Sequence, residues 1–456
     1  MKKLLMMIGA AADLTAKVLA AAIAAGAAIP MAANADVGTV DVNGVTWTVN
    51  TNATARTATL GNGTDACIAT TTSIDASLIP WTFTVGEGDD AIEYTVTSIA
   101  AHAFEECSKL SGTLTIPNSV TSIGINAFRN CSMLTKLASF GGLTQIASRS
   151  FDYCSGLDNT ECPDMSKLTY IESYNRFYFG GEARLTSISN SRGIGDNAFR
   201  YASITNVVFP RRAADIAGKQ IFQYCTGLTG MYLPGPDSGT DRLLVRRTDF
   251  ASGCTSLKVF LAGPLTGLSD SFGKTDVSMF TSVSGCRMFV PYGTTWNEES
   301  DERKGLAAYE ANNTIFYYGA GRELDMSFDN DRKLVTATPA TAHALTNVLA
   351  AATTIKNVFG MDTRINVTNA IEIAAGSISA AELAGVTFDS LTFAVKTQAQ
   401  LDTVLAAVPV ETPLAIDPEG ATENLTVLTE NRKIYVMLPT NGTYKVRPGG
   451  IIIFVK

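Results

Sequence analysis

Two neighbouring stretches of the chain share one skeleton. The first, "VTSIAAHAFEECSKL", covers Val96–Leu110, and the second, "VTSIGINAFRNCSML", covers Val120–Leu134. Both read V-T-S-I-x-x-x-A-F-x-x-C-x-x-L, and they are offset by 24 residues. Self-similarity at such a period is the mark of a repeat architecture, so this skeleton decides the fold.

The skeleton continues downstream in a regular series of rungs. Rungs begin near Val96, Val120, Leu143, Leu168, Ser191, Ala214, Asp241 and Leu265. The rungs at Leu168 and Leu265 keep only part of the pattern. A period of 23 to 28 residues lies in the range of leucine-rich repeats. Each unit is too small to bury its own apolar side chains, so we expect stacked units to share one continuous core.

Two positions of the skeleton recur in register, a phenylalanine and the cysteine that follows it. They predict a structural ladder along the stacked rungs. The pairs are Phe104/Cys107, Phe128/Cys131, Phe151/Cys154, Phe222/Cys225 and, with one inserted residue, Phe250/Cys254. The rung with Phe199 has Ala202 in the cysteine slot. Prolines end several strand-like runs, at Pro117, Pro210, Pro234 and Pro291. Since proline cannot continue a strand ladder, each rung turns a corner at a fixed place.

The quoted stretches, together with "LTIPNSVTSI", resemble the treponemal-type leucine-rich repeat of the Bacteroides surface protein A-like family. The resemblance covers about residues 75–295. It implies a leucine-rich-repeat solenoid of parallel strands with turns and short helical segments. It also implies an exported or surface-displayed protein that binds host or neighbour macromolecules, with no catalytic residue set and no cofactor.

The eight cysteines raise the question of disulfides. Five of them share one repeated slot, and Cys162 falls where Ile116 sits in its rung, so the register favours buried free thiols. Disulfides between neighbouring rungs remain the alternative, because strands about 4.8 Å apart bring such residues within bridging range. Cys67 and Cys286 lie outside the repeated slot and stay undecided. A linear ladder does not converge on a zinc ion, so no metal site is expected.

Outside the repeats, we expect four further segments. Residues 1–35 carry Lys2 and Lys3, apolar runs and a small-residue "ANA" site, which predict an export signal cleaved before Asp36. An uncleaved membrane anchor is the alternative. Residues 36–95 read as an N-terminal β cap, residues 96–295 as the repeats, residues 296–320 as the C-terminal cap, and residues 321–456 as an α+β or β-rich domain of unrecognised family.

The composition excludes several function classes. A formal net charge of -8 argues against general binding to nucleic acid or anionic membranes. The chain has only two histidines, which leaves little material for histidine-based catalysis. In the C-terminal domain, no motif pairs the acidic residues Asp362, Glu372, Glu382, Asp389 and Asp402.

Three groups of residues are candidates for ligand binding. Outward strand positions form a small, polar row with one aromatic residue: Thr113, Thr115, Lys136, Ala138, Asn159, Glu161, Asn206, Val208, Gly230 and Tyr232. Tyrosines precede the ladder slot at Tyr153, Tyr201 and Tyr224, either as a structural stack or as platforms for sugar or peptide. Arg211, Arg212, Arg246 and Arg247, with Arg242 behind them, form a patch that suits an acidic glycan unless nearby aspartates neutralise it.

The leading hypothesis is therefore a secreted or cell-surface bacterial adhesion protein that binds extracellular protein or glycan through its solenoid and has no catalytic activity. It would contact a membrane only through its signal or surface attachment. A structural or surface-layer spacer is the first alternative. An enzyme hidden in the C-terminal domain is the second.

Overall fold

The computed structural model describes most of the chain beyond the N-terminal segment. The described residues are 36–157, 162–177, 179–185, 188, 193–211, 214–216, 218–236, 243–245, 249–268, 279–293, 306, 309–367, 371–372, 386–408, 414–419, 421–422, 424–428, 434–438, 442–446 and 451–454. The expected export signal, residues 1–35, lies outside them. Within the described part, no helix is both long and apolar enough to cross a membrane.

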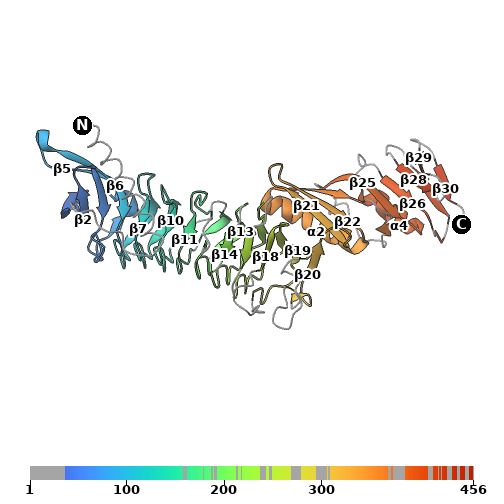
Figure 1. The fold of residues 1–456 in the computed structure, drawn as a ribbon, viewed down its shortest axis with the longest axis horizontal. Helices are drawn as coiled ribbons and strands as arrows, with labels where there is room; N and C mark the ends of the chain where they lie inside the picture. Colours follow the sequence, from blue (N-terminus) through green and yellow to red (C-terminus); the bar gives the residue numbers. More distant parts are fainter. Residues whose placement is uncertain are drawn as a thin grey trace, which may run out of the picture.

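The N-terminal cap is a mixed sheet that covers the first rung (Figure 1). Its path runs β1 (Asp36–Val42), β2 (Val45–Asn52), β3 (Thr57–Leu60), β6 (Ile92–Ile99) and β5 (Thr82–Val85). Two short 3-10 turns, η1 (Ala76–Leu78) and η2 (Gly88–Asp90), flank β5. Trp47 is fully buried and meets Phe104 of the first rung edge to face, with ring centroids 6.3 Å apart. The apolar face of the cap thus closes the open end of the repeat core.

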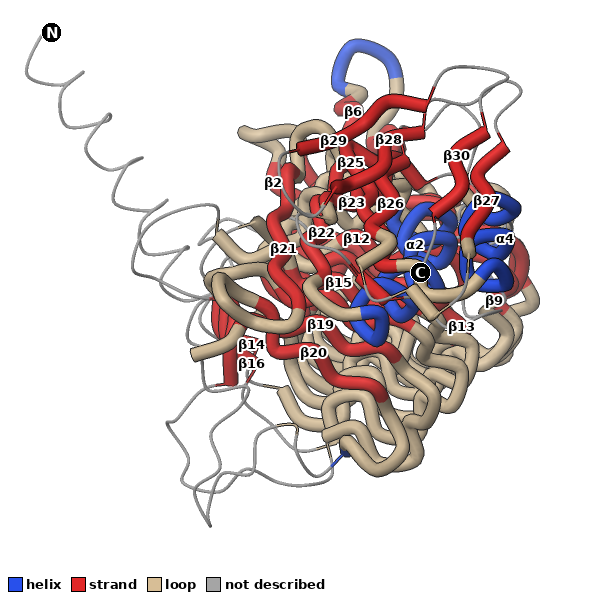
Figure 2. Tube along the Cα trace, turned by 90° about the vertical axis from the view of Figure 1, so that its right-hand side faces the viewer, coloured by secondary structure: helices blue, strands red, loops and turns tan. Residues whose placement is uncertain are grey.

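The repeats form a solenoid of parallel strands, which confirms the predicted fold class. One strand series runs β4 (Ile74–Asp75), β7 (Leu110–Thr115) and β9 (Leu134–Ser139), and a later one runs β12 (Gly180–Arg184), β13 (Ser203–Val208), β15 (Gly230–Leu233), β17 (Val259–Ala262), β19 (Arg287–Pro291) and β20 (Thr314–Tyr318). Figure 2 shows the strands of successive rungs stacked behind one another along the molecule.

A second set of short parallel strands marks the start of each rung. These are β8 (Ser122–Ile123), which pairs with β6; β10 (Gln145–Ile146) with β11 (Tyr170–Ile171); and β14 (Ala214–Ile216), β16 (Leu243–Val245) and β18 (Thr266–Leu268). Ile171 also pairs with Ile194 in an isolated bridge. Turns connect the strands in the described rungs, where the resemblance had implied short helical segments.

The phenylalanines of successive rungs stack along the solenoid axis. Phe104 and Phe128 lie 4.7 Å apart between ring centroids with an interplanar angle of 4°. In the irregular rung at Leu168, Phe177 enters the stack, 5.8 Å from Phe151 and 5.5 Å from Phe199. The stack therefore continues through the rung in which the sequence pattern fails. At the inserted residue before Cys254, by contrast, Phe250 turns edge-on to Phe222 at 86°.

The cysteine slot forms a second ladder, made of hydrogen bonds. The thiol of Cys131 donates to the carbonyl oxygen of Phe104 in the preceding rung at 3.1 Å, and Cys154 donates to Phe128 at 3.0 Å. Cys225 and Cys254 repeat the contact with Phe199 and Phe222. The ten residues of the Phe–Cys ladder are all buried, and all eight cysteines of the chain are free thiols.

The described C-terminal residues build a second sheet together with helices α2 and α4. Its strand path runs β21 (Leu324–Asp329), β22 (Leu334–Pro339), β23 (Asp362–Asn366), β25 (Val386–Ala394), β26 (Leu414–Asp417), β28 (Ile434–Leu438) and β29 (Gly442–Val446), with β24 (Ile371–Glu372) beside β25. Helices α2 (Ala342–Phe359) and α4 (Gln398–Ala407) connect parallel strands, and β27 (Leu425–Leu428) pairs with β30 (Ile451–Phe454).

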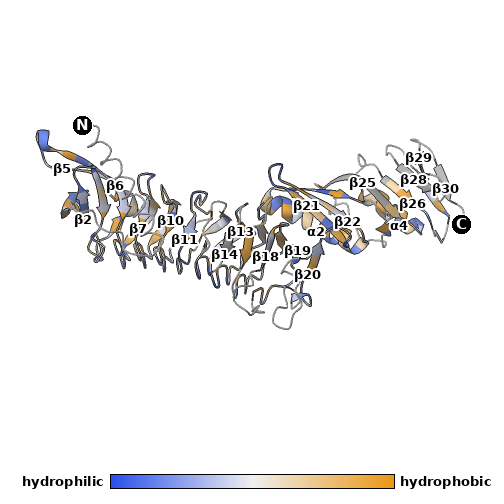
Figure 3. Ribbon diagram, in the orientation of Figure 1, coloured by the Kyte–Doolittle hydropathy of each residue, from blue (hydrophilic) through white to orange (hydrophobic). Residues whose placement is uncertain are grey.

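Along the whole molecule, apolar residues concentrate in the strands, whereas the tip of the β5–β6 hairpin in the N-terminal cap is hydrophilic (Figure 3).

Helix α2 joins the two halves of the molecule. Its threonine N-cap, Thr341, accepts a hydrogen bond from the backbone N–H of Ala344, and Gly360 ends it in the left-handed conformation. The helix contacts β13, β15 and β17 of the solenoid as well as β22, β23 and β25 of the C-terminal sheet. One buried cluster therefore contains residues of the helix and of both sheets.

Candidate interaction surfaces

The outward face of the solenoid sheet is open in its first rungs and covered in its later rungs. Thr113, Thr115, Lys136 and Ala138 are exposed. Further along, Asn206 and Tyr232 are buried, at 7% and 4% exposure. Asn159 and Glu161, which belong to the same predicted row, lie outside the described residues. The predicted ligand face is thus interrupted halfway along the solenoid.

The prediction that Tyr232 lies on an accessible face is wrong. Its ring packs between Phe328, 5.9 Å away, and Phe359, 5.7 Å away, and its hydroxyl hydrogen-bonds Asn330. These partners belong to the β21–β22 hairpin and to helix α2. Val259, Leu261 and Phe289, also outward on their strands, are buried in the same cluster. The C-terminal domain covers this face because the face is apolar, and burial of apolar surface favours the contact.

The backbone at Gly230 fits the end of α2 closely. A Cβ at this position would lie 2.5 Å from Cγ1 of Val358 and 2.8 Å from the ring of Phe359. Only a residue without a side chain permits this approach of helix to strand. The row of small outward residues that reads as a polar ligand face therefore includes a helix-docking position.

The predicted arginine patch is only partly described. The guanidinium of Arg211 lies 2.6 Å from the carboxylate of Asp331, which belongs to the β21–β22 turn. This partner belongs to the C-terminal domain and was not among the nearby aspartates that the sequence suggested. Arg212, Arg242, Arg246 and Arg247 lie outside the described residues.

A row of tyrosines and arginines runs along the turn edge of the solenoid. We call it the tyrosine–arginine row and define it by Arg149, Tyr153, Arg176, Arg200, Tyr201 and Tyr224. Its three tyrosines are 45%, 47% and 42% exposed. Tyr201 and Tyr224 stack with ring centroids 5.2 Å apart at 15°.

Guanidinium groups lie over the tyrosine rings of this edge. The Arg176 guanidinium carbon is 4.8 Å from the Tyr153 centroid, and that of Arg200 is 4.8 Å from Tyr201 and 5.6 Å from Tyr224. Arg149 lies 5.2 Å over Tyr174 in the next rung. Such cation–π contacts orient an arginine while leaving its N–H groups available in the plane of the guanidinium.

Asp152 provides a negative charge beneath the row. It is almost fully buried, and it attracts Arg176, whose Nε is 3.5 Å away, and also Arg149 and Arg129. Burial raises the pKa of Asp152, while the arginines act in the opposite direction. Arg129 is already engaged by Glu105 at 2.7 Å. In the described residues, Arg149 and Arg200 take part in no ion pair.

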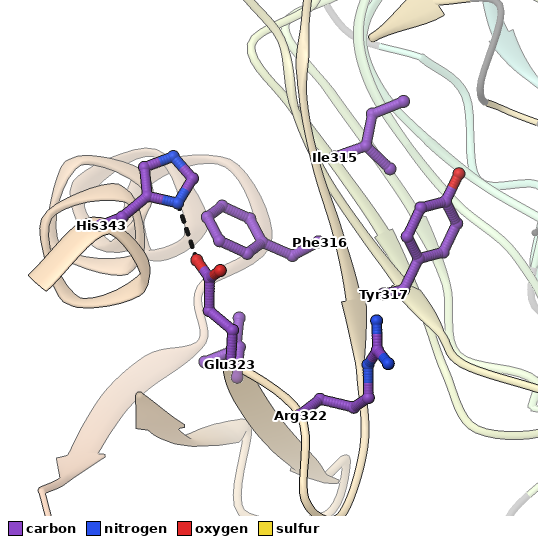
Figure 4. A pocket seen from close by; sticks show the side chains of 7 residues that line it. Ile315, Phe316, Tyr317, Arg322, Glu323 and His343 are labelled. Carbon is purple, nitrogen blue, oxygen red and sulfur yellow. Dashed lines mark hydrogen bonds and ion pairs between the residues drawn. The ribbon is translucent and has the colours of Figure 1, made fainter. Parts of the chain in front are cut away.

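A small pocket lies at the junction between β20 and helix α2 (Figure 4). Its volume is about 120 Å³, and it is lined by Ile315, Phe316, Tyr317, Arg322, Glu323, Leu324 and His343. The ring of His343 packs 5.2 Å from Phe316, and its Nδ1 is 2.7 Å from a Glu323 oxygen. These contacts hold the start of α2 against the strands. The lining includes no serine or cysteine that could act as a nucleophile.

The candidate acidic side chains of the C-terminal domain that the structure describes each pair with a separate neighbour. Asp362 pairs with Lys356, Glu372 with Lys396 at 2.6 Å, and Asp402 accepts from Gln398 at 2.8 Å. Glu382 and the side chain of Asp389 are outside the described part. Among the described residues, no group of three or more histidine, cysteine, aspartate or glutamate side chains could hold a metal ion.

Comparison with known protein families matches the first part of the solenoid. The profile of the BspA-type leucine-rich repeat region matches residues 91–188 in six copies. These residues are BspA-type leucine-rich repeats. A search of curated proteins found no match.

Solved structures of bacterial leucine-rich-repeat proteins are similar to this chain. A leucine-rich cell surface protein from Faecalibacterium prausnitzii A2-165 is 17% identical over 63% of this chain and 96% of its own, with a TM-score of 0.29. A leucine-rich repeat protein from Bacteroides ovatus ATCC 8483 is 15% identical over 89% and 87%, with a TM-score of 0.31. The pneumococcal vaccine antigen PcpA is 13% identical over 62% and 99%, with a TM-score of 0.19.

Proposed function

We propose that this protein is an exported interaction protein of the bacterial cell surface or extracellular space, which binds an extracellular protein or glycan through its solenoid without catalysis. The observation that carries this proposal is the tyrosine–arginine row, in which the three tyrosines and Arg149 are exposed and Arg176 and Arg200 are half-buried beside them. Exposed aromatic and arginine side chains are the residue types that dominate binding energy at recognition surfaces. The BspA-type repeats support a protein of the surface type.

The binding surface in this proposal consists of the turn edge and the open sheet face of the first rungs. The later sheet face is excluded, because α2 and the β21–β22 hairpin occupy it. The solenoid core, with its stacked phenylalanines, keeps the turns at a constant spacing. Exposed side chains are therefore held in a fixed row, which lowers the conformational-entropy cost of ordering them when a partner binds.

A structural spacer is the second candidate. The docked C-terminal domain lengthens the molecule into one extended body with the cap at the opposite end (Figure 1). A spacer needs that length and rigidity but no exposed recognition row. A binding experiment separates the two candidates.

The test is an array of extracellular-matrix proteins, neutral glycans and acidic glycans probed with the full exported chain. We expect saturable binding to at least one class of partner, weakened by substitutions in the tyrosine–arginine row. A control variant, Arg332→Gln, changes an exposed arginine on the C-terminal hairpin and should bind normally. No binding across the array would contradict the interaction proposal and favour the spacer.

A further inference from the structure

The tyrosines of the row are not required by the backbone that holds them. Tyr153, Tyr201 and Tyr224 have φ angles of 58°, 66° and 61°, in the left-handed region that side chains other than asparagine and aspartate rarely adopt. The same slot holds Glu106, Asn130 and Gly253 in other rungs. Since this turn accepts a glycine or an asparagine, its fold does not explain three exposed aromatic residues. The left-handed conformation belongs to the repeat turn, because Glu106 and Asn130 share it, so the tyrosines are a choice of side chain on a common backbone.

The rings themselves are partly occupied within the protein, which limits what can bind there. Tyr201 and Tyr224 stack on each other, and a Cβ at Gly253 would lie 2.4 Å from the Tyr224 ring. Nη2 of Arg200 also donates to the Tyr201 hydroxyl at 3.3 Å, and its Nε is buried. The groups left for a ligand are the Tyr153 and Tyr224 hydroxyls, the ring edges, the guanidinium of the exposed Arg149 and the remaining guanidinium N–H groups of Arg200. This set offers many hydrogen-bond donors and positive charge, so it favours an anion over a neutral sugar face.

The spacing of the groups favours an extended ligand. Tyr153 and Tyr201 are two rungs apart, which corresponds to roughly 10 Å along the axis at the usual strand spacing. Arg149 and Arg200 also belong to rungs that are two apart, so a small anion reaches only one of them at a time. A linear polymer, in contrast, contacts several rungs at once and gains from their combination.

We infer that the tyrosine–arginine row binds a linear acidic polysaccharide, whose carboxylate groups are held by Arg149 and Arg200 and whose hydroxyl groups contact the exposed tyrosine edges. This inference rests on the proposed interaction function and assigns its ligand class. The chain as a whole is acidic, with a net charge of -8, so such binding depends on this local row and not on overall attraction.

The experiment measures binding of the full exported chain to polygalacturonate, with dextran as the neutral probe. We expect binding that weakens as salt is added, and no binding to dextran. Arg149→Gln/Arg200→Gln should lose about tenfold or more in affinity, because charge-assisted hydrogen bonds are among the stronger ones. Arg200→Lys should lose most of the contribution of Arg200, because lysine lacks the planar fork.

Three further variants separate the tyrosine–arginine row from other parts of the surface. Arg332→Gln removes one exposed positive charge elsewhere and should bind as the wild type does. Tyr224→Phe keeps both stacked rings and the Arg200–Tyr201 hydrogen bond but removes one hydroxyl, so a loss with unchanged thermal unfolding assigns that hydroxyl to the ligand. The quadruple variant Arg211/Arg212/Arg246/Arg247→Ser tests the other arginine patch and should retain affinity.

Three results overturn the inference. These are equal affinity of wild type and Arg149→Gln/Arg200→Gln, loss only in the quadruple variant, and no binding to polygalacturonate. If polygalacturonate fails while a matrix protein binds in the array, the ligand class is wrong and the interaction function stands. If every probe fails, the interaction function falls as well.

Discussion

The side-chain amide of Asn206 donates a 2.8 Å hydrogen bond to the backbone carbonyl of Val358, which lies 152 residues later in the chain. That carbonyl is in the last turn of α2, where the helix offers no partner of its own. A solenoid strand therefore caps a helix of the C-terminal domain. Together with the apolar contacts of Gly230 and Tyr232, this bond makes the two halves one packed unit.

Gly230→Val should weaken this docking. The new side chain must enter space held by Val358 and Phe359, and overpacking of this kind costs about 1–3 kcal/mol. We expect a lower unfolding midpoint and faster proteolysis between residues 318 and 324. Gly38→Val is the matched control, because no atom lies within 4 Å of a Cβ at that position. If Gly230→Val resisted the protease as well as the wild type does, helix α2 would not pack against this strand as closely as the structure shows.

The cysteine slot should tolerate alanine but not aspartate. Cys131 is fully buried, and its thiol makes only a weak hydrogen bond to Phe104, so Cys131→Ala should cost little. Cys131→Asp places a carboxyl group without a partner in the core and should destabilise by several kcal/mol or prevent folding. Urea unfolding measures the stability of both variants.

The buried thiols of the native protein should resist alkylating reagents until the chain unfolds. A Cys107–Cys131 disulfide found by peptide mapping would contradict the ladder of free thiols.

Stability should fall in alkaline solution. Burial raises the pKa of Cys154, Cys162 and Cys286 to about 12 and that of Cys107 to about 11, from an ordinary value of 9.0. Above pH 9, the folded state therefore binds more protons than the unfolded state. The contribution of these thiols to the free energy of unfolding is fully present below pH 9 and is lost as the pH rises toward their pKa values in the folded state. Each thiol contributes a slope of about 1.4 kcal/mol per pH unit.

Urea midpoints between pH 8 and pH 11 test this dependence. Tyrosine and lysine groups also titrate near the upper end, so Cys154→Ala is the reference and should show a shallower decline. An identical decline in Cys154→Ala would remove the thiols as its cause.

Phe128→Ala should be among the most destabilising single changes in the repeats. The ring is fully buried and stacked at 4.7 Å on Phe104 and 5.4 Å on Phe151. Its loss leaves a cavity, and such changes cost about 3–5 kcal/mol. Ile125→Ala in the same rung is the control, since Ile125 is 43% exposed. Similar unfolding free energies for the two variants would show that the stack contributes little.

The exported protein should begin at or near Asp36. This prediction rests on the "ANA" site and the upstream apolar run, which lie outside the described residues. Intact-mass measurement of protein recovered outside the cell checks it. Retention of Met1 would indicate the uncleaved anchor instead.

Regular slots made the solenoid predictable. The Phe–Cys skeleton specifies side chains that meet their own copies one rung away, so a local pattern implies a tertiary contact. The irregular rung shows where this reasoning stops. Phe177 enters the stack one position later than the skeleton suggests, and the Asn175 amide donates to the carbonyls of Ala147 and Glu172 to accommodate the shift. Nothing in the repeat pattern indicated which of the nearby aromatic residues would turn inward.

The sequences of the later solenoid strands already indicated that their outward face is covered. The strands β17, β19 and β20 read "VFLA", "RMFVP" and "TIFYY", continuous apolar runs that are typical of strands buried on both faces. The earlier strand β9, "LTKLAS", has polar residues between its two buried leucines and remains open on one face. This contrast marks where the solenoid sheet passes beneath the C-terminal domain, although not which element covers it.

The sequence by itself determined the repeat and the core slots and favoured free thiols in the repeated slot, because these depend on side chains that recur at one short period. Only the tertiary structure decided which surface is left for a partner. Tyr232 became core and Arg211 an internal ion pair because α2 and the β21–β22 hairpin, far away in the chain, pack against their rungs. Packing between distant segments depends on the shape of both surfaces, and no periodicity in either one records it.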